Sequence, residues 1–305
     1  MPSWPIMSDT AFMSAPASLI LVANVRLFHR AERKHVCRDT GFYSVRTPVL
    51  IVCYNLAMDK IREAASEEVM IYNLGNRVVN NYMIPLENGY MLIDTGYANG
   101  FRRFQKKLQK AKIDPKEIKY VFLTHAHDDH VGFLNEVLEL TDAKVILHPK
   151  AIEVLRRGQN SFEGGCSGRL AYFFCQILKL FGKGEHRFPA IRDEYMNRLI
   201  TTDSEDFRSL KKTFQVVETP GHTTDHIALL IGDTMFCGDA AMNGFPSIRR
   251  VIIWIGNKEQ FKRSWEKIIG LAPRDLYPAH GKPFKTSDLE KYLPFLDGIR
   301  LYQLK

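Results

Sequence analysis

The stretch Thr124-His125-Ala126-His127-Asp128-Asp129-His130 places three imidazoles and two carboxylates within seven residues, directly after the apolar run Tyr120–Leu123. Neutral imidazole and carboxylate oxygen are the usual ligands of catalytic zinc. His125 and His127 are two residues apart, whereas the helical zinc motif places two histidines one turn apart on a helix face. The spacing therefore predicts a tight loop that leaves a strand and folds around metal positions. A polar loop with chance histidines is disfavoured, because the chain has only ten His.

The composition bounds the class of protein. With 305 residues and 45% hydrophobic content, the chain can bury a full core, as one large domain or as two small ones. Its five cysteines are odd in number and scattered, without a CxxC pair, which argues against a disulfide framework and against a cysteine-type zinc site. The expected compartment is therefore reducing, namely the cytoplasm. No apolar stretch reaches the length of a membrane span.

The formal net charge of +8 raises the question of a nucleic-acid partner. The basic residues do not form a long run of like charge, and aromatic residues are not interleaved with them. A strip that would follow a phosphate backbone is therefore weakly supported, and nucleic acid is not the expected partner.

The first 57 residues have a different pattern from the rest of the chain. Two short apolar patches, 19–23 and 49–53, lie among scattered charges, and no basic residue precedes the first patch as a signal peptide would require. We expect a poorly defined extension over residues 1–57, either disordered or loosely attached. An alternative is that translation begins at Met58. In both cases the expected hydrolase domain covers residues 58–305.

Regular patterns begin near Glu68 and alternate between strand and helix, which predicts an α/β layered domain. The strands are expected at 69–72, 78–86, 90–93, 120–123, 144–147, 214–218, 226–231, 234–237 and 276–277. The helices are expected at 101–111, 133–140, after Pro149, at 258–269 and after Ser287.

A helical insertion is expected at about residues 158–213. It contains an apolar and aromatic segment that predicts a helix over about 169–182. A helix that is apolar on nearly every side needs cover on most sides, which favours a core helix or a homodimer contact. The alternative is a lid whose aromatic side chains hold an apolar part of a substrate.

Three later positions share the environment of the histidine-rich loop. His222, Asp239 and His280 each follow a predicted strand, in turns that contain Gly or Pro. Loops beyond strand ends are where layered α/β folds place their reacting groups. One such histidine alone would be structural in most proteins, but the three together indicate a site.

In this order, the motifs resemble the metallo-β-lactamase superfamily, and in particular its glyoxalase II-like and lactonase-like metallohydrolases. The strand end Leu92–Gly96 resembles the first motif of that family, and the resemblance extends from about Val69 to the C-terminus. It implies a four-layer αβ/βα sandwich with a dinuclear metal site at one edge. It also implies three ligands for the first metal, three for the second and one bridging carboxylate, namely His125, His127 and His222; Asp129, His130 and His280; and Asp239.

Four nearby side chains are given other roles. Asp94 is implied by the resemblance to orient a ligand imidazole. For His226, a hydrogen bond to the metal-site loop is favoured over a role like that of the histidine in thioester and ester hydrolases of the superfamily. Asp128 does not match a ligand position and is interpreted as solvated or orienting. Cys237 is expected to be an inert buried thiol.

The leading hypothesis is a dinuclear-metal hydrolase that activates a bridging water to cleave a small ester, thioester or lactone, with acyl-homoserine lactones as one candidate. Asp129 or Asp239 would relay the proton to the leaving group. Zinc is the expected metal, with iron and manganese as alternatives. The expected partner is a small-molecule substrate with an apolar acyl part.

Two alternatives stay open. One is a phosphodiesterase or nuclease of the same fold, supported only by the positive charge. The other is a metal-bearing ligand-binding protein without turnover. β-Lactamase activity is not expected, because true β-lactamases of this fold resemble one another in lacking a bridging carboxylate at the position of Asp239.

Overall fold

The structure, a computed structural model, describes residues 70–161, 163–180, 186–210 and 214–304. The predicted extension over 1–57 and the expected domain start at Met58 lie outside these residues. So do Val69 and the last two positions of the helix predicted at 169–182.

Six strands form the first sheet, in the order β1-β2-β3-β4-β5-β7. β1, β2 and β3 are antiparallel, and β3, β4, β5 and β7 run parallel. Parallel strands are buried on both faces and therefore have continuous apolar sequences, which explains why the apolar runs predicted β3, β4 and β5. The strands are β1 (Tyr72–Asn73), β2 (Tyr82–Leu86), β3 (Gly89–Ile93), β4 (Ile118–Phe122), β5 (Lys144–Leu147) and β7 (Leu199–Thr201).

Five strands form the second sheet, in the order β13-β12-β10-β9-β8. β8, β9 and β10 are antiparallel, β10 and β12 are parallel, and β13 closes the edge antiparallel to β12. The strands are β8 (Gln215–Glu218), β9 (Ile227–Ile231), β10 (Thr234–Gly238), β12 (Asp275–Pro278) and β13 (Phe284–Lys285).

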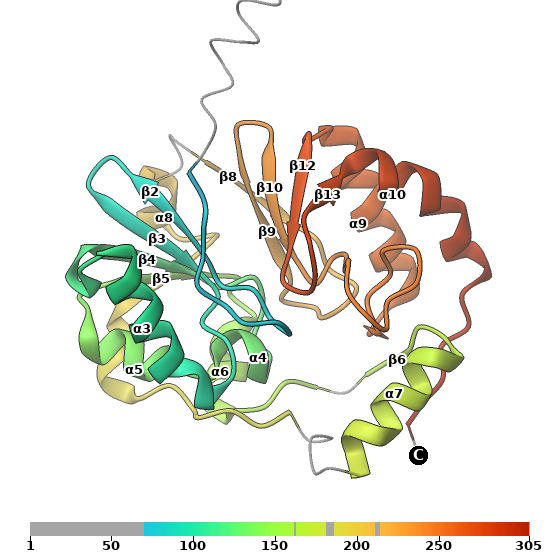
Figure 1. The fold of residues 1–305 in the computed structure, drawn as a ribbon, viewed down its shortest axis with the longest axis horizontal. Helices are drawn as coiled ribbons and strands as arrows, with labels where there is room; N and C mark the ends of the chain where they lie inside the picture. The colour runs from blue at the N-terminus through green and yellow to red at the C-terminus, as the bar shows by residue number, and fades with distance from the viewer. Residues whose placement is uncertain (1–69, 162, 181–185, 211–213, 305) are drawn as a thin grey trace, which may run out of the picture. The chain divides into compact units, whose positions relative to one another are not determined.

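The two sheets pack face to face, and helices cover their outer faces (Figure 1). Alternate residues of one strand enter different layers: Met91 and Ile93 of β3 lie in the cluster shared by the sheets, whereas Leu92 lies under the helices. This arrangement confirms the predicted αβ/βα sandwich. The helices are α3 (Phe101–Ala111), α5 (Leu134–Leu140) and α6 (Ala151–Arg157) on the first sheet, and α9 (Lys258–Leu271) and α10 (Thr286–Tyr292) on the second.

The range expected to be an insertion, residues 158–213, contains some elements that lie outside the sandwich layers and others that belong to them. It contains a two-residue strand, β6 (Gly165–Cys166), and helix α7 (Arg169–Leu180). β6 pairs with β11 (Trp254–Ile255) outside both large sheets. The range also contains β7, which pairs with β5, and α8 (Glu205–Leu210). The part that lies outside the sandwich layers therefore ends before β7.

Helix α7 is not buried on all sides. Ala171 and Cys175 pack against the chain near Tyr302, whereas Phe173 and Ile177 are 59% and 52% exposed. Its apolar outer face explains why its sequence suggests a buried helix. The roles of lid, core helix and dimer contact stay predictions. Among the described residues, no helix is long and apolar enough to cross a membrane.

Candidate metal centre

The histidine-rich stretch begins where β4 ends, at the edge of the first sheet. His125 and Ala126 extend from the strand, and His127 caps a short helix, α4 (Asp128–Val131). The sequence predicted a loop here, and the turn of helix is a correction. Two carboxylates in the first turn favour it, because negative side chains stabilise a helix N-terminus. The helical turn directs Asp129 and His130 toward the same space as His125.

One group of three imidazoles converges at this edge. The Nε2 atoms of His125 and His222 lie 3.0 and 3.1 Å from Nδ1 of His127. His222 comes from the turn after β8 in the second sheet, about a hundred residues away in the chain. These three nitrogens form one of the groups that can hold a metal ion.

A second group lies beside the first. Nε2 of His280 is 3.1 Å from Oδ2 of Asp129, and Nε2 of His130 is 3.5 Å from Oδ1 of Asp129. Asp239 lies between the groups, with Oδ2 at 3.4 Å from Nε2 of His222 and Oδ1 at 3.5 Å from Nε2 of His280. The structure therefore brings together all seven residues that the sequence proposed as ligands.

Backbone carbonyl groups fix the orientation of two of these imidazoles. Nδ1 of His222 donates to the carbonyl oxygen of Trp254 at 2.8 Å, and Nδ1 of His280 donates to that of Val78 at 2.7 Å. A proton on Nδ1 leaves the lone pair of a neutral imidazole on Nε2. In its neutral form, each ring therefore presents a lone pair to the centre.

Side chains fix the orientation of two others. Nδ1 of His130 lies 2.8 Å from Oδ2 of Asp94, and Nδ1 of His125 lies 3.1 Å from the hydroxyl of Thr124. That hydroxyl donates to Oδ2 of Asp94, and the amide of Thr124 donates to Oδ1. Asp94 has a φ of 56°, a left-handed conformation that Asp and Asn adopt more readily than most residues. Its contact with His130 is the one that the predicted orienting role requires.

Two buried polar atoms in this centre have no hydrogen-bond partner among the described residues: Nε2 of His130 and Oδ1 of Asp239. Buried polar groups are nearly always paired, and an unpaired one points to a missing partner such as an ion. An imidazole nitrogen and a carboxylate oxygen are both common ligands of divalent cations such as zinc. The residues present therefore fit the metal site that the resemblance implies.

Burial and neighbouring charges lower the pKa of three of these imidazoles and raise the pKa of two others. Burial lowers the pKa of His125, His127 and His222 below the usual range, so these rings are neutral as metal ligation requires. Burial would do the same for His130 and His280, but nearby carboxylates outweigh it and raise both pKa values well above the usual range. A cation at the second group therefore has to displace protons.

His226 supports the centre from behind. Its Nε2 accepts a hydrogen bond from the amide of Asp239 at 3.0 Å, and its Nδ1 lies 2.8 Å from the hydroxyl of Thr219. This geometry agrees with the favoured interpretation of a histidine bonded to the site loop. Gly238 permits the close approach, because a Cβ there would lie 2.9 Å from Nε2 of His226.

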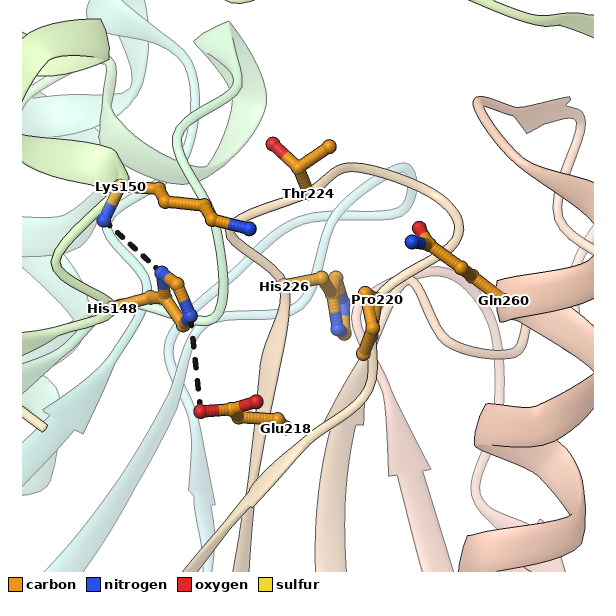
Figure 2. A pocket seen from close by; sticks show the side chains of 7 residues that line it. All are labelled: His148, Lys150, Glu218, Pro220, Thr224, His226 and Gln260. Atoms are coloured by element: carbon orange, nitrogen blue, oxygen red, sulfur yellow. Dashed lines mark hydrogen bonds and ion pairs between the residues drawn. The ribbon is translucent and has the colours of Figure 1, made fainter.

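The other side of His226 faces a small separate cavity (Figure 2). The volume of this cavity is about 70 Å³. His148 lies across it, accepts a hydrogen bond from the amide of Lys150 and has Nε2 3.9 Å from Glu218. The cavity has room for little more than water. We assign it no role in substrate binding.

Replacing His226 with glutamine should make the protein less sensitive to acid. Burial lowers the pKa of His226 from 6.5 to about 3. The unfolded chain therefore takes up this proton first, and the stability that the neutral ring contributes is present above pH 6.5 and lost progressively toward pH 3. Between pH 7 and pH 5, the unfolding free energy of the wild type should fall by about 2 kcal/mol more than that of His226→Gln.

Urea unfolding of both proteins at the two pH values, in excess chelator, measures this difference. Glutamine keeps an acceptor for the amide of Asp239, which protects the fold. His148→Gln, across the same cavity, is the control and should lose less of the acid sensitivity, because burial lowers the pKa of His148 but Glu218 partly opposes this effect. An equal fall in His226→Gln and wild type would show that His226 is not held neutral.

Several contacts around the site were not predicted. Oδ1 of Asp128 lies 2.8 Å from Nδ1 of His186, so Asp128 orients a second histidine and is not simply solvated. Asp225 accepts a hydrogen bond from the amide of Ala126 at 2.9 Å and so anchors the histidine-rich stretch. Tyr97 lines the cleft together with Asp129, whose charge helps raise the pKa of the Tyr97 hydroxyl. The only sequence signal for Tyr97 is its place directly after Asp94-Thr95-Gly96.

Cys237 has no part in the ligand set. Its side chain is fully buried in the cluster beneath α9 and α10, and burial raises the pKa of its thiol. Asp239 lies beyond the end of β10, after Gly238 with a φ of 49°, and enters the group of candidate ligands.

Five of the seven residues line a cleft of about 980 Å³, namely His127, Asp129, His222, Asp239 and His280. Helix α3 borders one side, and helix α7 with the segments around Phe245 and Ile253 borders the other. The cleft is large enough for a small organic substrate.

The model of the metallo-beta-lactamase superfamily matches residues 74–280, more than half of the chain. The chain therefore belongs to this superfamily, which comprises metal-dependent hydrolases that typically bind one or two divalent metals. The family predicted from the motif order is confirmed.

Individual relatives are distant. The "Beta-lactamase-like protein 2 homolog" of Drosophila melanogaster is 24% identical over 211 residues, which are 66% of this chain but only 58% of that protein. The "Probable metallo-hydrolase YflN" of Bacillus subtilis is 23% identical over 80% of this chain and 98% of its own length. A "Hydroxyacylglutathione hydrolase" of Psychromonas ingrahamii is 27% identical over 41% of this chain and 33% of its length.

Among solved structures, an archaeal metallo-beta-lactamase superfamily protein, ST1585 from Sulfolobus tokodaii, has a TM-score of 0.54 and 22% identity. The match covers 78% of this chain and 89% of that one. At this identity the likeness supports the fold and leaves the substrate open.

Proposed function

We propose that this protein hydrolyses a small ester, thioester or lactone with two divalent metal ions, zinc being the expected metal. His125, His127 and His222 would hold one ion and Asp129, His130 and His280 the other, with Asp239 between them. The observation that carries the proposal is a pair of buried atoms without a hydrogen-bond partner among the described residues, Nε2 of His130 and Oδ1 of Asp239, within the cluster of candidate ligands.

When bound, two such ions lower the pKa of a water toward neutrality and polarise the carbonyl group of a substrate. The residues of the chain prepare that chemistry. In their neutral forms, His130, His222 and His280 hold their Nε2 lone pairs toward the centre through fixed bonds on Nδ1. The carboxylates of Asp129 and Asp239 face the cleft and are placed to carry a proton to the leaving group.

Tyr97 supports Asp129 in this role. Burial and the neighbouring carboxylates of Asp129, Asp128 and Asp239 raise the pKa of Tyr97, so its hydroxyl stays protonated and is able to donate. Its side chain also lines the cleft. Tyr97 therefore adds a hydrogen-bond donor at the wall of the site that it shares with Asp129.

Replacing Tyr97 with phenylalanine should lower kcat about tenfold while the metal content stays at the wild-type value. The change removes one hydroxyl from the wall of the cleft and adds no bulk. Steady-state kinetics combined with elemental analysis measure the two effects. Tyr292→Phe, on α10 and outside the cleft, is the matched control. Unchanged kcat in Tyr97→Phe would remove Tyr97 from the mechanism.

The proposed function is tested by offering the purified protein a panel of p-nitrophenyl esters, acyl lactones, thioesters and bis-p-nitrophenyl phosphate, with and without chelator. We expect turnover of an ester, thioester or lactone that chelator abolishes and added zinc restores. Elemental analysis of the protein as purified identifies the metal. Absence of chelator-sensitive turnover on every carboxylic substrate would refute the proposal.

A phosphodiesterase is the second candidate, favoured by one observation: Arg102, Arg103 and Lys106 line the cleft. A preference for bis-p-nitrophenyl phosphate over all esters would establish it. Tight co-purification of a small ligand without turnover would instead favour a metal-bearing binding protein.

The three described cysteines are unpaired thiols, which supports the proposed reducing, cytoplasmic location.

A further inference from the structure

The cleft above the metal centre has two chemically different walls. Helix α3 and the loop between β1 and β2 form a basic wall, whose charged members are Arg77, Arg102, Arg103 and Lys106. The opposite wall is apolar and comes from α7 and two segments of the second half, with Phe174, Leu178, Phe245, Pro246 and Ile253. In Figure 1, α3 and α7 lie on opposite sides of α4, which carries part of the metal centre.

The basic wall carries cationic side chains that no acidic side chain of the described residues neutralises in an ion pair. Helix α3 contains five cationic residues and no acidic one. Lys107 bonds to the backbone carbonyl groups of Asn73 and Gly75. Within the part of the chain that the structure describes, the cations that line the cleft form neither an ion pair nor a hydrogen bond. Several like charges along one rim attract an anion and raise its rate of association.

The apolar wall offers surface that a bound chain would cover. The rings of Phe174 and Phe245 meet edge to face at 6.1 Å, which links α7 to the loop across from it. Phe245 is nevertheless 78% exposed. Leu178 lies one helical turn beyond Phe174 on the same side of α7. An acyl chain placed here would remove this surface from water.

We propose that the substrate is an acyl ester or thioester whose leaving group carries phosphate or carboxylate. The anionic leaving group binds the basic wall, the acyl chain binds the apolar wall, and the scissile carbonyl group lies between them over the metal centre. This inference rests on the proposed hydrolase function and narrows it to one class of substrate. A nucleic acid fits less well, because only one wall is basic and the other has no polar match for a second strand or a continuing backbone.

The probes are four thioesters with the same reacting bond, given to the metal-loaded enzyme. Octanoyl-coenzyme A carries phosphates, S-octanoylglutathione carries carboxylates, and S-octanoyl-N-acetylcysteamine carries no charge. Acetyl-coenzyme A tests the acyl chain. We expect kcat/KM for one anionic octanoyl thioester to exceed that of the neutral one by about tenfold or more at low salt, and the ratio to shrink as salt is added. The anion with the larger ratio identifies the leaving-group chemistry.

Variants of each wall test whether the basic wall causes the preference for an anionic leaving group and the apolar wall the preference for a long acyl chain. The double variant Arg102→Gln/Lys106→Gln should reduce the ratio of anionic to neutral kcat/KM close to one, whereas Lys110→Gln, on the same helix but outside the cleft, should retain it. Phe174→Ser should reduce the preference for octanoyl over acetyl about tenfold, whereas Ile177→Ser, on the outer side of α7, should retain it. Ratios of kcat/KM for two substrates are compared, because a general loss of activity in a variant lowers both values equally and cancels in the ratio.

The outcomes separate this inference from the proposed function. Chelator-sensitive hydrolysis with equal kcat/KM for anionic and neutral thioesters, or a preference that survives the double variant, overturns the inference and leaves the hydrolase intact. Failure of every thioester, ester and lactone overturns both. Faster cleavage of bis-p-nitrophenyl phosphate or single-stranded RNA, lowered by the double variant, overturns both and assigns the basic wall to a phosphodiester.

Discussion

Asp239→Asn should lower kcat/KM about a thousandfold, the largest loss expected from any single change in this chain. Oδ2 of Asp239 lies 3.4 and 3.6 Å from Nε2 of His222 and His130, and Oδ1 lies 3.5 Å from Nε2 of His280. This carboxylate therefore lies close to imidazole nitrogens of both metal groups. Asparagine has nearly the same volume but removes the negative charge on which both ions would depend.

Kinetics and elemental analysis together test this result, and we expect the metal content to fall from two ions per chain toward one or none. Asp233→Asn is the matched control, since it removes a carboxylate from the exposed turn that joins β9 and β10. A melting curve of the metal-free protein shows whether the variant folds. Wild-type kcat/KM with a full metal content in Asp239→Asn would show that Asp239 does not bridge.

Asp94→Asn should reduce metal affinity and kcat/KM by about 10–100-fold, although Asp94 is not among the proposed ligands. Its two oxygens accept three hydrogen bonds, from the amide and hydroxyl of Thr124 and from Nδ1 of His130. Asparagine retains one acceptor oxygen. If that oxygen pairs with the amide of Thr124, the side-chain NH2 faces Nδ1 of His130, which then has to accept. The proton of His130 moves to Nε2, and the ring cannot ligate.

This substitution separates charge and hydrogen bonding from backbone conformation, because asparagine also tolerates the φ of 56° at this position. Chelator competition measures metal affinity, and the nitrogen chemical shifts of His130 report its tautomer. Thr124→Val is the comparison: it removes one donor to Asp94 and the hydroxyl beside Nδ1 of His125 but leaves the bond between Asp94 and His130, so the tautomer of His130 should stay that of the wild type. The same tautomer and affinity in Asp94→Asn as in the wild type would contradict the orienting role.

Much of the fold can be predicted from the sequence, because strands buried on both faces need continuous apolar runs. Leu92-Ile93 of β3 and Val121-Phe122 of β4 send alternate side chains into two different cores. The metal ligands are visible for a related reason: each follows such a run, at the edge where strand ends meet. The order of these motifs then predicts their convergence.

The remaining features of the fold and the site depend on contacts between segments far apart in the chain, and such contacts leave no local sequence pattern. The short strands β6 and β11 pair across the chain, and β7 lies within a range that otherwise suggests an insertion. The bond between Asp128 and His186 joins residues 58 positions apart. Helix α7 is misleading for a different reason, because its exposed apolar face has the sequence of a buried helix.

The division of the ligand set between the two sheets has a consequence for how long the protein survives. The first sheet and its loop supply His125, His127, Asp129 and His130, and the second sheet supplies the remaining three ligands. Ions bound at the centre would hold the sheets together, because no ion can keep its full set of ligands when the sheets separate. Metal binding would therefore slow the opening that exposes the chain to proteases. In a cell short of metal, the apoprotein would be degraded first, and the amount of enzyme would follow the supply of its cofactor.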